Sequence, residues 1–195
     1  KKTGIKFYAN LIDEIATSLN IKSATLIGLS MGGMVLQEFI TKKRSLKVNK
    51  AVILASIHFF YQQSKLNKLR LAIRLFIAKL LPYKFQAYLI GTILFPKDQH
   101  NKKLFIKYFL KSNQVTYLKL LRDMKKVDYR QKLKNIDQKI LFIAGANDQI
   151  IPIKYQRKIS DFIKNINFIT FPGGHVINID ASLKVNEAIK KFLTN

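Results

Sequence analysis

Four short runs of apolar residues constrain the fold of this 195-residue chain more than any other feature of its sequence. They are rich in Ile, Val, Leu and Phe, and they occupy residues 24–29, 50–56, 139–145 and 167–174. None of them alternates strictly between apolar and polar residues, which is typical of strands buried on both faces of a parallel sheet. Because segments with helical periodicity separate the runs, the sequence predicts an α/β fold with a mostly parallel sheet.

The segment between the second and third runs has a different composition. Residues 60–135 are rich in Lys, Leu, Phe and Tyr, and an insertion of this length between adjacent strands is commonly a lid or a binding element. We therefore predict a core formed by 1–59 and 136–195, with 60–135 as a helical cap over the carboxyl ends of the strands. Apolar periodicity predicts helices over 7–21, directly after Ser30, and near 64–81, 84–94, 101–111 and 113–126.

One stretch, LIGLSMGGMVLQ at 26–37, brackets Ser30 with glycines between a predicted strand and a predicted helix. It matches the pattern G-x-S-x-G, in which a serine sits on a sharp, strained strand-to-helix turn with its hydroxyl exposed. We expect Gly28 and Gly32 to relieve crowding beside the serine. The turn also places Ser30 at a helix N-terminus, where the backbone N–H of Met31 would face a developing oxyanion.

Two further polar residues follow the ends of predicted strands. Asp148 lies in GANDQIIP after the third run, and His175 lies in FPGGH at the end of the fourth. Open α/β sheets place their sites outside the carboxyl ends of their strands, so we expect Ser30, Asp148 and His175 to converge. Alternatively, Asp148 is an N-cap for a helix beginning near Pro152. His58 and His100 lack the Gly-Gly setting and are expected to be structural or surface residues.

With these motifs in this order, the sequence resembles the α/β-hydrolase superfamily, in its capped esterase, lactonase and acyl-hydrolase branch. The resemblance covers 10–58 and 137–194 and implies that the four runs are the family's fifth to eighth strands. The family's first four strands, and the HG-type loop with the second oxyanion-hole amide, have no counterpart. We therefore expect a C-terminal fragment in which the second donor is missing and which is not a competent enzyme alone.

The resemblance implies a serine hydrolase that cleaves a small carboxylic ester, thioester or lactone through an acyl-enzyme. Ser30 would be the nucleophile, His175 the base and Asp148 the residue that orients the imidazole, with no metal and no organic cofactor. Three alternatives stay open. They are a lipase-like enzyme at anionic membranes, a non-catalytic binding protein of the same fold, and a cofactor-free perhydrolase.

The charge balance is strongly basic, with 35 Lys and Arg against 11 Asp and Glu, a net charge of +24. Such an excess favours weak contact with anionic membranes, but the even scatter of lysines favours a solvated surface. No nucleic-acid-binding module and no sign of an obligate protein partner is evident. The absence of Cys excludes disulfides, thiolate zinc sites and a thiol nucleophile. Charged residues and Pro82 interrupt the longest apolar region, 71–95, before it reaches the length of a membrane span, and we expect a cytoplasmic protein.

Overall fold

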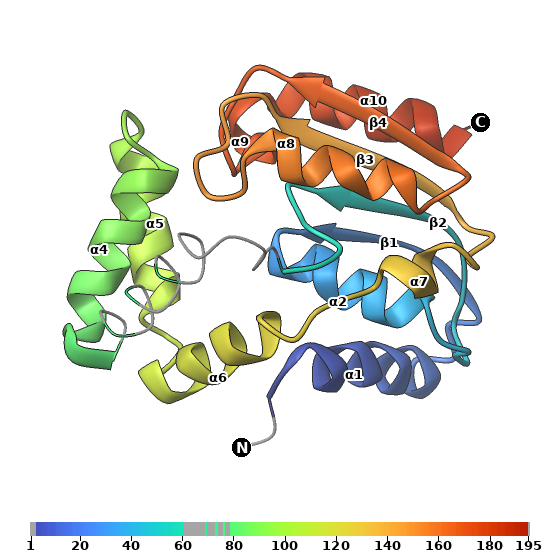
Figure 1. The fold of residues 1–195 in the computed structure, drawn as a ribbon, viewed down its shortest axis with the longest axis horizontal. Coiled ribbons are helices and arrows are strands. Elements are labelled where there is room, and N and C mark those ends of the chain that lie inside the picture. The colour runs from blue at the N-terminus through green and yellow to red at the C-terminus, as the bar shows by residue number, and fades with distance from the viewer. Residues whose placement is uncertain (1–2, 61–68, 70–72, 74–75, 77–78, 195) are drawn as a thin grey trace. The chain divides into compact units, whose positions relative to one another are not determined.

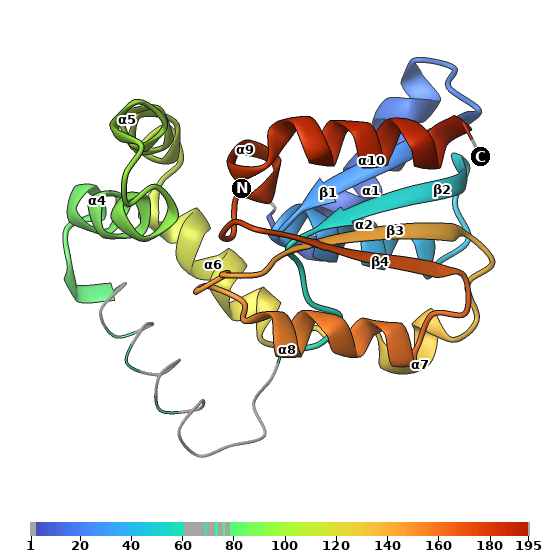
Figure 2. The ribbon, with the colours of Figure 1, turned by 90° about the horizontal axis from the view of Figure 1, so that it is seen from above.

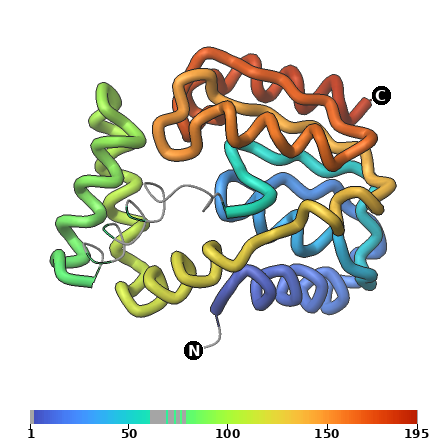
Figure 3. Tube along the Cα trace, viewed as in Figure 1, coloured from blue at the N-terminus to red at the C-terminus, as the bar shows by residue number. Residues whose placement is uncertain are grey.

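The computed structural model describes residues 3–60, 69, 73, 76 and 79–194. The chain forms two compact units, one from Lys1–Phe60 with Lys126–Asn195 and one from Tyr61–Lys125. In Figure 3 the two ends of the chain trace, blue and red, run through the first unit. The expectation that 126–135 belong to the cap is wrong, because these residues are part of the first unit. They include the short helix α7 (Arg130–Leu133), in which Leu133 is completely buried.

A parallel sheet forms the centre of the first unit (Figure 1). Its described strands follow the order of the chain: β1 (Ser23–Leu29), β2 (Lys47–Leu54), β3 (Lys139–Gly145) and β4 (Ile166–Phe171). Each strand pairs in parallel with the next, with Ile27 opposite Val52 and Ile53 opposite Phe142. The predicted α/β class and the parallel strand order are therefore confirmed.

Burial differs between the inner and outer strands of this sheet. The last four residues of β2 and the last six of β3 are buried, as predicted. In contrast, β1 is largely accessible, with 53% of Ile27 exposed, and β4 is mostly half-buried. The prediction of burial on both faces is wrong for these two strands because each lies at an edge of the described sheet and has a neighbouring strand on one side only.

Helices cover both faces of the sheet. On one face α9 (Ile177–Asp180) and α10 (Ser182–Thr194) pack on a cluster formed by Val52, Leu54, Leu141, Ile143, Ile177 and Val185. Figure 2 shows α10 and α8 (Ile153–Gln156) on opposite sides of the sheet. The 3-10 helix Arg157–Asp161 follows α8 directly.

The helix α2 (Met31–Ile40) joins β1 to β2, and α1 (Ile5–Ser18) packs against it. A Cβ on Gly33 of α2 would lie 3.1 Å from a methyl group of Ile53, which shows how closely the helix approaches the sheet. Met34, Val35 and Phe39 of this helix belong to the core, with at most 6% of each residue exposed.

The second unit contains α4 (Tyr83–Leu94), α5 (Gln99–Phe109) and α6 (Gln114–Met124), close to three of the predicted helices. Rings from all three helices pack together, because the Phe109 ring lies 4.8 Å from that of Tyr83 and 5.2 Å from that of Tyr117. The predicted helix over 64–81 lies largely outside the described residues. No helix in the described part of the chain is long and apolar enough to span a bilayer.

The chain leaves the first unit after Phe60 and returns to it at Lys126, and backbone hydrogen bonds pair the segments at these two points. Phe60 N–H donates to the Val127 carbonyl at 3.0 Å, and Tyr129 N–H donates to the His58 carbonyl at 2.9 Å. An antiparallel bridge joins Phe59 to Asp128 between these two bonds. The function of the inserted helices as a lid stays a prediction.

Candidate active site

Ser30 occupies the turn between β1 and α2 with a strained backbone, as expected. Its φ of 53° and ψ of −115° are a backbone conformation whose strain costs ~1–3 kcal/mol for a residue with a side chain. Two hydrogen bonds hold the turn against the neighbouring strand. Ser30 N–H donates to the Leu54 carbonyl at 2.8 Å, and the Ser56 hydroxyl donates to the Ser30 carbonyl at 2.7 Å. The surrounding fold therefore fixes the position from which the Ser30 hydroxyl projects.

Close packing explains only one of the two glycines that we expected to relieve crowding. A Cβ on Gly28 would lie 2.5 Å from the Gly32 carbonyl oxygen, so this position has no room for a side chain. A Cβ on Gly32 would meet nothing within 4 Å, so the expectation is wrong for Gly32. The physical reason is that the backbone of Gly32, and not a side chain, fills the space beside Gly28. The neighbouring Gly33 is confined instead, because a Cβ at this position would lie 2.6 Å from the Cβ of Ser56.

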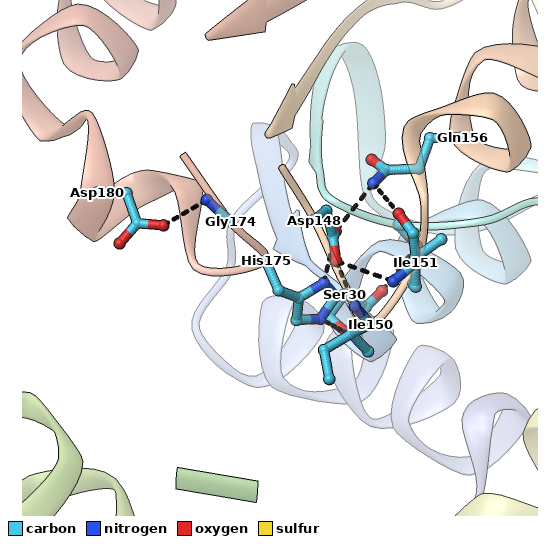
Figure 4. A network of polar contacts seen from close by, with 9 residues as sticks. Ser30, Asp148, Ile150, Ile151, Gln156, Gly174, His175 and Asp180 are labelled. Atoms are coloured by element: carbon cyan, nitrogen blue, oxygen red, sulfur yellow. Dashed lines mark hydrogen bonds and ion pairs between the residues drawn. The ribbon is translucent and has the colours of Figure 1, made fainter. Parts of the chain in front are cut away.

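The structure brings Ser30, His175 and Asp148 together in one chain of hydrogen bonds (Figure 4). The Ser30 Oγ lies 2.8 Å from His175 Nε2, and His175 Nδ1 lies 2.8 Å from Asp148 Oδ2. A carboxylate can only accept, so Nδ1 carries the proton and Nε2 accepts from the Ser30 hydroxyl. This is the arrangement in which an imidazole can take a proton from a hydroxyl that attacks a carbonyl.

Asp148 is buried, with 5% of its surface exposed, and both of its carboxylate oxygens are hydrogen bonded. Oδ1 accepts from the N–H groups of Ile150 and Ile151, each at 2.8 Å, and Oδ2 accepts from Gln156 Nε2 at 2.9 Å in addition to His175. These donors replace the water that a buried carboxylate loses. The alternative interpretation as an N-cap is not realised, because α8 begins at Ile153 with Pro152 as its N-cap.

The loop that carries His175 is held by its backbone at two points. A Cβ on Gly145, at the end of β3, would overlap the Gly174 carbonyl oxygen, so the two segments meet backbone to backbone. On the other side, Gly174 N–H donates to Asp180 Oδ2 at 2.6 Å (Figure 4). The imidazole is therefore presented from a loop fixed by both β3 and α9.

Three residues in this arrangement were missed by sequence reasoning. Gln156 supports Asp148, Asp180 supports the His175 loop, and Ser56 supports the Ser30 turn. Gln156 and Ser56 are fully buried polar residues. Ser56 ends one of the apolar runs, which was the available signal, whereas nothing in the sequence distinguishes Gln156 from the other glutamines.

The other two histidines lie apart from this hydrogen-bond chain. His58 is fully buried and its ring nitrogens have no hydrogen-bond partner among the described residues. Burial, with a smaller contribution from the Arg130 charge, lowers the pKa of His58 to about 4. His100 is exposed in α5 of the second unit. Both positions agree with the expectation that these residues are structural or at the surface.

Met31 is the first residue of α2, so its N–H has no acceptor within the helix. That donor directly follows the serine. It therefore lies where it could stabilise an oxyanion on a carbonyl group attacked by Ser30. Within the described residues, no group of three His, Asp or Glu side chains could hold a metal ion. The chemistry that the described side chains offer is therefore a base-activated hydroxyl beside a backbone donor.

Solved structures of an esterase, an enol-lactonase and a bromoperoxidase share this fold. The chain superposes on an esterase from Exiguobacterium antarcticum with a TM-score of 0.87 at 18% identity, covering 98% of this chain and 74% of the esterase. For an enol-lactonase from Burkholderia xenovorans the TM-score is 0.86 at 16% identity, covering 100% and 74%. A bromoperoxidase from Bacillus anthracis gives 0.84 at 17% identity, covering 96% and 73%. At these identities the likeness shows the fold.

The sequence itself matches one family model over residues 7–175, which is most of the chain. That model describes the serine aminopeptidase family, S33. No curated protein matches the sequence. Because the match includes both Ser30 and His175 and the fold agrees with it, this chain belongs to the serine aminopeptidase family, S33, of the α/β-hydrolases.

Proposed function

We propose that this protein is a serine hydrolase that cleaves a carboxylic ester, thioester or lactone through an acyl-enzyme. The observation that carries the proposal is the hydrogen-bond chain in which Ser30 Oγ and Asp148 Oδ2 each lie 2.8 Å from a nitrogen of His175. The membership of the hydrolase family and the fold shared with an esterase and a lactonase also support it.

In the proposed reaction, the Ser30 hydroxyl attacks the substrate carbonyl while His175 Nε2 takes its proton. The negative charge that forms on the carbonyl oxygen is stabilised by the Met31 N–H. As the tetrahedral intermediate collapses, the bond to the leaving group breaks and the imidazolium returns the proton to it. Water then attacks the acyl-enzyme with His175 again as base, which releases the acid and restores Ser30.

Asp148 keeps the imidazole in the tautomer that this cycle requires. Its carboxylate accepts the proton of His175 Nδ1 and stabilises the imidazolium that forms twice per turnover. The donors from Ile150, Ile151 and Gln156 keep the carboxylate in place. Because we assign one backbone donor to the oxyanion and loss of a donor typically costs ~10²–10³ in kcat, we expect slow turnover by the 195-residue chain.

An aminopeptidase activity is the second candidate, because the family is described by that name. Such a substrate carries a free α-ammonium group, which favours binding near unpaired carboxylates. The chain has 11 acidic residues against 35 basic ones, and Asp148 and Asp180 are already engaged near Ser30. The electrostatics therefore favour a neutral or anionic acyl substrate over a cationic peptide end.

Perhydrolase chemistry on the same residues is the third candidate, since a bromoperoxidase shares the fold. In that reaction hydrogen peroxide would replace water as the nucleophile that attacks the acyl-enzyme, and a peracid would leave. The first half of the cycle is the same, so the two functions differ only in which nucleophile completes it. Peroxide-dependent halide oxidation in acetate buffer measures this second half.

Labelling by a fluorophosphonate probe tests the nucleophile without requiring full turnover. We expect a single adduct on Ser30, located by peptide mass spectrometry, and none in Ser30→Ala or in the heat-unfolded chain. Hydrolysis of p-nitrophenyl butyrate and of leucine p-nitroanilide then separates the first two candidates. A folded protein that takes up no probe would overturn the serine mechanism and favour the non-catalytic binding protein.

A further inference from the structure

A cleft of about 590 Å³ lies in the first unit, away from Ser30. It is formed by the end of α2, the loop that follows, and the first residues of β2 and β3. Ser30 lies at the other end of the strands, because its N–H bonds to Leu54, the last residue of β2. Eight strand residues span roughly 25 Å, so the cleft is separate from the candidate active site.

The cleft gathers positive charge well beyond the average of the chain. Six of its thirteen lining residues are basic and one is acidic, whereas 35 of all 195 residues are basic. The six are Lys42, Lys43, Arg44, Lys47, Lys50 and Lys139. In a concave surface, such charges reinforce one another and attract anions.

Two of these lysines are already engaged by the protein. Lys42 pairs with Glu38 at 2.6 Å, and Lys50 Nζ donates to the carbonyls of Phe192 and Leu193 at the end of α10. In the described structure the ammonium groups of Lys43, Lys47 and Lys139 have no hydrogen bond or ion pair. Lys139 also lies opposite Lys50 in the pairing of β2 with β3, where like charges destabilise a sheet.

The loop that presents these charges is held in place by α1. Asp13 accepts from the N–H groups of Ser45 and Leu46, and Asn10 Oδ1 accepts from Arg44 Nη1 at 2.7 Å. The guanidinium of Arg44 stacks over the Phe39 ring, yet its buried Nε and Nη2 have no acceptor among the described residues. A fixed loop that presents free ammonium groups on a cleft is preorganised for an anion.

We propose that this cleft binds a soluble anion carrying two or more phosphate groups. Three free ammonium groups exceed what a single phosphate neutralises, whereas a chain of phosphates supplies several charges and acceptor oxygens within a short length. The cleft volume lies in the range of small-molecule sites, and its concave form suits a compact ligand better than a flat bilayer surface. The site is independent of the proposed hydrolase reaction.

Calorimetric titration with inorganic tripolyphosphate at physiological ionic strength tests this site on the whole chain. The cleft variant is Lys43→Gln/Lys47→Gln/Lys139→Gln, and the matched control is Lys164→Gln/Lys184→Gln/Lys190→Gln, exposed lysines of the same unit. We expect saturable binding that the cleft variant weakens about tenfold and the control changes little. Equal far-UV circular dichroism spectra of both variants and the unchanged protein check that the fold is intact.

Three results would overturn the proposal. The first is equal weakening by both triple variants, which would mean that the overall charge binds the anion. The second is absence of saturable binding to the unchanged protein. The third comes from vesicles of phosphatidylcholine and phosphatidylserine in equal parts. Cosedimentation that the cleft variant loses, without tripolyphosphate binding by the unchanged protein, would assign the lysines to a membrane surface.

Discussion

The loop around His175 and the segment around His58 both bury an imidazole in the same unit, but they treat its nitrogens differently. His175 has Ser30 and Asp148 as partners, each at 2.8 Å. His58 packs between the rings of Phe59 and Phe162, with centroids at 4.8 and 5.1 Å, and has no hydrogen-bond partner among the described residues. The carboxylate beside His175 can stabilise a charge on the ring, whereas the surroundings of His58 oppose one.

This difference teaches that burial alone does not make a histidine a base. Removing an imidazole from water lowers its affinity for a proton, which is what the pKa of about 4 for His58 expresses. A catalytic imidazole must accept a proton from a hydroxyl, so it needs hydrogen-bond partners on both ring nitrogens, which His58 lacks among the described residues. The predictions below test the partners of His175 and the isolation of His58, from the largest expected effect to the smallest.

The largest effect is expected from Ser30→Ala, which removes the proposed nucleophile. Ester hydrolysis should fall on the order of 10⁴-fold or more, because the remaining residues cannot form the acyl-enzyme. Initial rates with p-nitrophenyl butyrate and fluorophosphonate labelling measure the loss. Ser18→Ala, at an exposed serine of α1, should behave as the unchanged protein. Labelling that persists in Ser30→Ala would break the assignment of His175 as its base.

The buried imidazole of His58, which has no hydrogen-bond partner among the described residues, predicts a loss of folding stability in acid. Its pKa is about 4 in the folded chain and about 6.5 when unfolded, so between these values the unfolded chain binds the extra proton. The free energy of unfolding should therefore decrease as the pH falls from 6.5 to 4, by about 3 kcal/mol in total from this residue. Urea unfolding at a series of pH values measures it.

The matched variants for that measurement are His58→Phe and His100→Phe. Phenylalanine cannot bind a proton and suits the aromatic surroundings of His58, so His58→Phe should flatten the decrease. His100 is exposed and remains solvated in both states, so His100→Phe should retain it. An unchanged acid dependence in His58→Phe would mean that the ring finds a partner and would remove the contrast with His175.

A smaller effect is expected from Gln156→Leu, which removes one donor from Asp148 Oδ2 while filling a similar volume. Loss of a hydrogen bond to a charged group should decrease kcat about tenfold. KM should change little, because Gln156 is fully buried and acts through Asp148. Steady-state kinetics separate the two constants. Gln131→Leu at an exposed glutamine is the control, and a change in KM alone would contradict the positioning role.

The smallest effect is expected from Ser56→Ala. The Ser30 carbonyl loses the Ser56 hydroxyl as a donor but keeps the N–H groups of Gly33 and Met34. We expect a decrease of about 1 kcal/mol in the free energy of unfolding and a severalfold decrease in labelling rate. Thermal unfolding and time-resolved labelling measure these quantities. A variant as inactive as Ser30→Ala would show that Ser56 has a chemical function of its own.

The sequence predicted the parts of the site that local chemistry dictates. Ser30, Asp148 and His175 each follow an apolar run, and Gly28 could be recognised because a serine turn of this kind leaves no room for a side chain. Gln156 and Asp180 could not be recognised, because their function depends on which backbone group or carboxylate the tertiary fold brings opposite them.

The sequence by itself thus determined the element types, the parallel sheet and the three residues at its carboxyl end, because apolar periodicity and glycine spacing act over a few residues. Only the tertiary structure decided which side chains gather at the amino end of the strands. The lysines look evenly scattered along the chain, yet the pairing of β2 with β3 sets Lys50 opposite Lys139 and brings both to the loop after α2. Charge density depends on distances in space, and those are fixed only when strands far apart in sequence pair.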